Sequence, residues 1–255
     1  MDLSLRRRLC MLLLLLHAAA LSPWLAEAAS LPAWKEVSTS LGSIKLRELG
    51  PHDGPLAICI HGAMNNEFIR GEWDEIALKL AEAGYHVLIP NFHSGPKTTT
   101  PRHTNSDDVR ALIVDLAFTL DGFVPSRYKA VAAPKAKRPK VFVLGKSWGG
   151  RQAAEIALLP QVVGAALVAP AIGEKEAGII MPKIKGEVVL CMAKDDPVVP
   201  FSRAAKFLQN LPEKQTFIEA ASGGHKVLPE YTLPILALAE RIRDAFSHDE
   251  VPPEL

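Results

Sequence analysis

Short apolar runs alternate with amphipathic stretches along most of the chain. Five runs are almost continuously apolar, which is typical of strands buried on both faces of a parallel sheet. These runs cover residues 56–60, 86–90, 141–144, 164–169 and 187–193. Residues 43–49 alternate with a period of two and predict a half-exposed strand, and residues 34–40 and 215–220 can extend the sheet at its ends. The pattern therefore predicts eight strands.

Helical patterns fill intervals between these runs. The predicted helices cover residues 72–84, 106–123, 202–212 and 231–246. Because strands that alternate with helices need crossover connections, most of the strands should be parallel and helices should flank the sheet. Residues 124–140 are rich in Pro, Lys and Arg and predict a solvated loop, with a basic contact patch as the alternative.

The first 28 residues have the pattern of a secretory signal peptide. Three arginines precede an apolar run at residues 9–20, and Ala26-Glu27-Ala28 matches a cleavage site. The run is shorter than the about 20 residues that a membrane span needs. We therefore predict a signal peptide at 1–28, one domain at 29–255, and a secreted protein without a stable membrane anchor after cleavage. A retained N-terminal anchor and an organelle-lumen leader are the alternatives.

Composition narrows the range of functions. The chain has 29 basic and 28 acidic residues and few aromatic residues, so nothing indicates a nucleic-acid partner. Cys59 and Cys191 lie inside apolar runs, which predicts buried thiols; a disulfide between them is the alternative in an oxidising compartment. No residues have metal-ligand spacing, so we expect neither a metal nor a cofactor.

The stretch Gly145-Lys146-Ser147-Trp148-Gly149-Gly150 lies between a predicted strand and a helical pattern. A strand that ends on a nucleophile and turns sharply into a helix needs very small neighbours, because the backbone packs tightly there. The glycines let Ser147 protrude, and the amide end of the following helix points toward it. We therefore expect Ser147 to be a nucleophile.

A serine nucleophile needs a base and an orienting acid. Asp195 and Asp196 follow the run at 187–193, and His225 follows the run at 215–220 on a loop with two glycines. The carboxyl ends of parallel strands meet at one edge of a sheet, so these groups should lie near Ser147. The order Ser, Asp, His is that of hydrolases with such a turn. His225 is the expected base, with one of the aspartates as its acid.

Acyl transfer also needs donors for the developing oxyanion. The amide of Trp148, the residue after the nucleophile, should supply one donor. The loop after the run at 56–60 should supply the other, and the Ala63 amide is the best candidate. His61 in this loop is expected to be structural, with a role as base as the alternative.

These motifs resemble the α/β-hydrolase fold and, within it, the α/β hydrolase domain-containing 14 family. "HGAM", "GKSWGG" and "KDDP…GGH" carry the first resemblance, which covers roughly residues 40–246. "ALVAPAI" followed by "VVLCMAKDDP" carries the second. The resemblance implies a small single-domain hydrolase with esterase-type activity, and lysine deacetylation has been attributed to one member. It also implies that Asp196, the residue before Pro197, is the triad acid.

The connection between the runs at 164–169 and 187–193 is short. Residues 171–186 leave room for a short helix and no cap domain, so the site should be open. We expect the loop at 91–105 to lie over it, with His93 and His103 as loop residues rather than ligands.

We therefore predict an α/β-hydrolase fold with an eight-stranded, mostly parallel sheet, flanking helices and no cap domain. The predicted function is a serine hydrolase that cleaves an ester, thioester or amide of a small acyl group through Ser147, His225 and Asp196. Its expected partner is a small-molecule acyl substrate, and the sequence indicates no oligomeric state. The rival is a non-catalytic or slow-turnover ligand-binding receptor on the same fold.

Overall fold

A computed structural model of the protein describes residues 31–39, 42–63, 71–92, 111 and 140–248. The sheet and its helices belong to the compact unit Ala33–Leu255. The predicted signal peptide lies outside the described residues, as do nearly all of the predicted helix at 106–123 and of the loops at 91–105 and 124–140. These expectations, including secretion, stay predictions.

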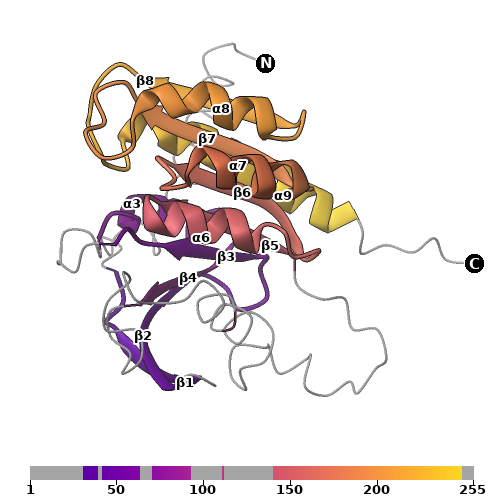
Figure 1. The fold of residues 1–255 in the computed structure, drawn as a ribbon. Helices are drawn as coiled ribbons and strands as arrows, with labels where there is room; N and C mark the ends of the chain where they lie inside the picture. Colours follow the sequence, from indigo (N-terminus) through magenta and orange to yellow (C-terminus); the bar gives the residue numbers. More distant parts are fainter. Residues whose placement is uncertain (1–30, 40–41, 64–70, 93–110, 112–139, 249–255) are drawn as a thin grey trace, which may run out of the picture. The chain divides into compact units, whose positions relative to one another are not determined.

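Eight strands form one sheet, as predicted (Figure 1). They are β1 (Lys35–Thr39), β2 (Gly42–Leu49), β3 (Leu56–Ile60), β4 (His86–Asn91), β5 (Val141–Lys146), β6 (Val162–Val168), β7 (Glu187–Ala193) and β8 (Gln215–Ala220). Their order in space is β1-β2-β4-β3-β5-β6-β7-β8. Strand β2 runs antiparallel to β1 and β4, and the other neighbours are parallel. The sheet is therefore mostly parallel, as the apolar runs indicate.

Helices cover both faces of this sheet. They are α3 (Asp74–Glu82), α6 (Trp148–Ile156), α7 (Glu174–Ile180), α8 (Ala204–Asn210) and α9 (Pro229–His248), with short 3₁₀ turns η2 (Met181–Lys183) and η3 (Phe201–Arg203). Figure 1 shows α6, α7 and α8 over one face and α3 and α9 over the other. None of the helices in the described ranges is both long and apolar enough to span a membrane.

The two-sided cover explains the continuous apolar runs. Phe142 and Val143 point to opposite faces of β5, and both are fully buried. Cys59 and Cys191 are buried free thiols, which confirms the prediction made for them. Burial raises the pKa of both thiols, so neither is a nucleophile at neutral pH.

The connection from β6 to β7 holds α7 and η2 and no further element. Within this connection, the prediction that no cap domain is inserted is confirmed. Strands β3, β5, β7 and β8 are parallel, so their carboxyl ends share one edge of the sheet. The predicted catalytic and oxyanion residues follow these strand ends. This edge therefore carries the candidate active site.

Candidate active site

Ser147 forms the sharp turn between β5 and α6. Its backbone has φ 56° and ψ −119°, an unfavourable conformation for a residue with a side chain. A Cβ atom at Gly145 would lie 2.1 Å from the carbonyl oxygen of Gly149, and one at Gly149 would lie 2.3 Å from that of Ile60. Both positions therefore need glycine, as the sequence pattern predicts for a nucleophile elbow.

Hydrogen bonds hold this strained turn against β6 and the residues that follow it. The Ser147 amide donates to the Val168 carbonyl at 2.9 Å, and the Ser147 carbonyl accepts from the Ala171 amide at 2.8 Å. The hydroxyl of Ser147 does not cap α6. The backbone is thus fixed while Oγ is not used to cap the helix.

Asp196 and His225 are in direct contact. The Nδ1 atom of His225 lies 2.7 Å from Oδ2 of Asp196. The other carboxylate oxygen accepts two backbone hydrogen bonds, from Val198 at 2.8 Å and Val199 at 2.9 Å. The Asp196 side chain is fully buried. Because an ionised carboxylate only accepts hydrogen bonds, His225 must donate its Nδ1 proton to Asp196, which leaves Nε2 as the basic atom.

Asp195 has a different task from its neighbour. Its exposed carboxylate accepts hydrogen bonds from the Gly223 amide at 3.1 Å and the Gly224 amide at 2.8 Å. These two bonds lower the pKa of Asp195. Gly223 and Gly224 have φ values of 132° and 65°, which favour glycine. Asp195 therefore holds the loop that carries His225, while Asp196 holds the imidazole.

The acid-base properties of His225 depend on burial and on two neighbouring charges. Burial lowers the pKa of its imidazole, the contact with Asp196 raises it, and the positive charge of Lys146 lowers it further. The net effect places the pKa below the ordinary value of 6.5. His225 is therefore mainly neutral at pH 7 and able to accept a proton.

The candidate oxyanion loop follows β3. The Gly62 amide donates to Oε1 of Glu72 at 2.6 Å, so this amide is already engaged. Ala63 is the next residue and is half-buried, and its amide stays the candidate donor. The second candidate, the Trp148 amide, belongs to the first turn of α6, where amides have no acceptor within the helix.

His61 is a structural residue of this loop, as expected. It is 1 % exposed, and its Nε2 accepts a hydrogen bond from the Phe92 amide at 3.0 Å. Its Nδ1 lies 2.6 Å from the Gly62 carbonyl oxygen, to which it must donate. With both ring nitrogens engaged, His61 joins the oxyanion loop to the end of β4 and is not available as a base.

A buried ion pair beneath the site was missed by the sequence reasoning. The Nζ atom of Lys146, which precedes the candidate nucleophile, lies 3.1 Å from Oε2 of Glu72. Both side chains are less than a tenth exposed. Burial raises the pKa of Glu72, and the Lys146 charge and the Gly62 amide oppose this effect. The pair therefore links the elbow to the oxyanion loop through charged groups.

Solved structures with the same architecture have low sequence identity to this chain. Est1E from Butyrivibrio proteoclasticus has a TM-score of 0.61 at 13% identity, over 85% of this chain and 100% of its own. XC6422 from Xanthomonas campestris, described as an α/β serine hydrolase without a lid, has a TM-score of 0.59 at 14% identity, over 87% and 96%. Alpha/beta hydrolase domain-containing protein 10 from mouse has a TM-score of 0.58 at 14% identity, over 85% and 99%. These similarities establish the α/β-hydrolase fold.

The family assignment comes from the sequence of the whole core. No curated protein matches the chain. The resemblance to the α/β hydrolase domain-containing 14 family stays a prediction, since no comparison bears on it directly. The family model that does match is that of the dienelactone hydrolases, over residues 52–221, which span β3 to the end of β8. The chain therefore belongs to the dienelactone hydrolase family.

Proposed function

We propose that the protein is a serine hydrolase that cleaves an ester, thioester or amide of a small acyl group through an acyl-enzyme intermediate. The observation that carries this proposal is the hydrogen bond of 2.7 Å between Asp196 and His225, on the strand edge where Ser147 forms a strained elbow. Membership of a hydrolase family supports the same chemistry.

Each residue has a defined task in this mechanism. Ser147 Oγ attacks the substrate carbonyl and transfers its proton to Nε2 of His225, which then protonates the leaving group. Asp196 fixes the imidazole tautomer and stabilises the imidazolium. The amides of Trp148 and Ala63 bind the oxyanion. In the second half-reaction, His225 activates a water molecule that hydrolyses the acyl-enzyme.

A fluorophosphonate probe on the full chain tests this function. The probe should label Ser147, and Ser147→Ala should abolish labelling and lower ester hydrolysis by on the order of 10⁴–10⁶-fold. Ser202→Ala is the matched control, because Ser202 is an exposed serine in η3, and it should behave as wild type. Activity of Ser147→Ala within tenfold of wild type would refute the mechanism. Labelling without turnover would favour the receptor function.

A further inference from the structure

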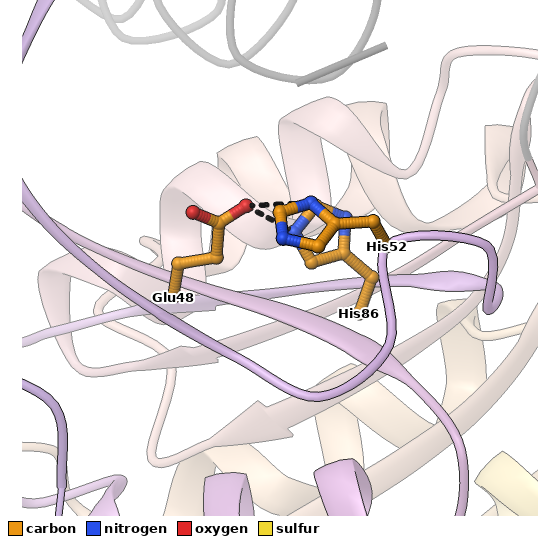
Figure 2. Close-up of side chains that lie close together, drawn as sticks. All are labelled: Glu48, His52 and His86. Atoms are coloured by element: carbon orange, nitrogen blue, oxygen red, sulfur yellow. Dashed lines mark hydrogen bonds and ion pairs between the residues drawn. The ribbon is translucent and has the colours of Figure 1, made fainter. Parts of the chain in front are cut away.

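A cluster of one carboxyl and two imidazole groups is drawn in Figure 2. It lies at the edge of the sheet opposite to the candidate active site. Glu48 comes from the end of β2, His52 from the turn after it, and His86 from the start of β4. Because β2 and β4 are antiparallel, the end of one meets the start of the other. The start of β4 lies at the edge away from the carboxyl ends, so this cluster is separate from the candidate active site.

The three side chains converge on one point. Both imidazoles face the same carboxylate oxygen, Oε1 of Glu48: Nε2 of His86 lies 2.6 Å from it and Nδ1 of His52 lies 3.3 Å from it. One ligand atom from each residue lies within 4.8 Å of the others. Around a tetrahedral zinc ion with bonds of about 2.0–2.2 Å, ligand atoms are about 3–3.5 Å apart. Small side-chain shifts therefore suffice to form a three-ligand site.

The donors of the cluster suit a metal. Imidazole nitrogens and a carboxylate oxygen are common zinc ligands. The Glu48 side chain is 9% exposed and offers a carboxylate with little screening by solvent.

We propose that Glu48, His52 and His86 bind Zn²⁺. Two histidines and one glutamate are an established zinc ligand set that leaves a fourth position for water. Mg²⁺ and Ca²⁺ prefer oxygen ligands, so the two imidazoles select against them. On binding, the proton through which His86 Nε2 contacts Glu48 moves to Nδ1, so that Nε2 can bind the metal, and His52 holds its ring proton on Nε2. The ion would tie the β2–β3 turn to β4, which is a stabilising cross-link.

Lys35 is the group with which zinc must compete. Its ammonium contacts Glu48 through Oε2, whereas the imidazoles face Oε1. The Lys35 side chain is 47% exposed, so it can turn toward water when the metal binds. Its positive charge weakens zinc binding by repulsion. Removal of this charge should therefore tighten zinc binding, so the proposal predicts a variant with higher zinc affinity than wild type.

Titration of Zn²⁺ into chelator-treated full-length protein, followed by calorimetry, tests the site. His52→Ala is the informative variant, because His52 is exposed and its loss should not unfold the protein. Lys35→Met tests the competing charge. His225→Ala is the control for zinc bound at the candidate active site instead. Thermal melts with and without zinc provide a second readout that does not depend on activity.

We expect one zinc ion per chain, binding at least tenfold weaker in His52→Ala, and tighter binding in Lys35→Met. His225→Ala should bind as wild type does. Zinc should raise the melting temperature of wild type by at least about 3 °C and should not raise that of His52→Ala. The proposal is overturned by no binding at about 100 µM Zn²⁺, by unchanged affinity in His52→Ala, or by loss of binding in His225→Ala.

Discussion

Replacement of Lys146 by Met would remove one partner of the buried ion pair below the elbow. Met keeps most of the apolar stem of lysine, so the change mainly removes charge. The Lys146 Nζ–Glu72 Oε2 distance of 3.1 Å corresponds to an attraction of about 5 kcal/mol at an effective dielectric constant of about 20. Without it, Glu72 is left buried without its counter-charge, and among the residues that the structure describes the Gly62 amide is the polar partner that remains.

Protonation of Glu72 limits the loss of stability. To protonate a carboxyl group with an ordinary pKa of 4.5 at about pH 7 costs about 3 kcal/mol, at about 1.4 kcal/mol for each pH unit. We therefore expect Lys146→Met to lower the free energy of unfolding by about 3 kcal/mol at neutral pH. In a domain of this size, such a loss lowers the melting temperature by about 6–12 °C.

The loss should also depend on pH, with a definite sign. In Lys146→Met the pKa of Glu72 in the folded state lies further above its unfolded value than in wild type. The variant then loses stability as pH rises from about 4.5, because the unfolded state releases the Glu72 proton first. The difference from wild type should be small near about pH 5 and large near about pH 8.

Urea unfolding at these two pH values measures the difference. Lys194→Met is the matched control, because the Lys194–Glu219 pair is exposed and its loss should change stability by less than about 1 kcal/mol. The double variant Lys146→Met/Glu72→Gln should recover much of the stability, because Gln keeps an acceptor for the Gly62 amide. A loss below about 1 kcal/mol near pH 8 in Lys146→Met, or a loss independent of pH, would refute the reasoning.

Three further predictions concern activity. Asp196→Asn should lower kcat far more than Asp195→Asn, because of these two aspartates it is Asp196 that contacts the imidazole. Steady-state kinetics of both variants test this, and the opposite ranking would show that the assignment is wrong. Because the pKa of His225 lies below 6.5, kcat/KM should fall only on the acid side of that value, and a fall that starts above about pH 7 in wild type would contradict this. Lys146→Met should move the fall to higher pH, because it removes a charge that lowers the pKa of His225. Nitrophenyl acetate or butyrate should have a higher kcat/KM than the C12 and C16 esters, since without a cap in the β6–β7 connection each added methylene gains little of its about 0.8 kcal/mol; a rise through C12 would indicate a buried acyl tunnel.

The fold was predictable because each buried strand is a short apolar run between helical patterns. Phe142 and Val143 illustrate why: strands covered on both faces cannot alternate, so their sequence differs from that of the half-exposed β2. The elbow was predictable for a related reason. A Cβ atom at Gly145 or Gly149 would lie 2.1 Å or 2.3 Å from a carbonyl oxygen, so both positions require glycine. This requirement is visible in the local sequence.

Side-chain partners from distant segments were not predictable in the same way. Lys146 stands out as a charge at the end of a buried strand, directly before Ser147, which is a signal that it has a buried partner. Nothing in the sequence shows that this partner is Glu72 rather than another acid. The same holds for the cluster of Glu48, His52 and His86. Glu48 and His52 are four residues apart, but it is the antiparallel pairing of β2 and β4 that brings His86 to them. Strand pairing joins segments that are distant in the sequence, so it is difficult to predict from the individual residues.

The two aspartates show how strand register brings a local motif into the proposed catalytic unit. The last residues of β7 and β8, Ala193 and Ala220, are direct partners in the sheet. The loops that follow therefore start side by side, although 29 positions separate Asp196 from His225. Asp195 then fixes the second loop through its glycine amides, and Asp196 fixes the imidazole. The two aspartates after β7 and the Gly-Gly-His segment after β8 therefore act together. A shift of one residue in the β7–β8 register would move the two loops apart and break these contacts.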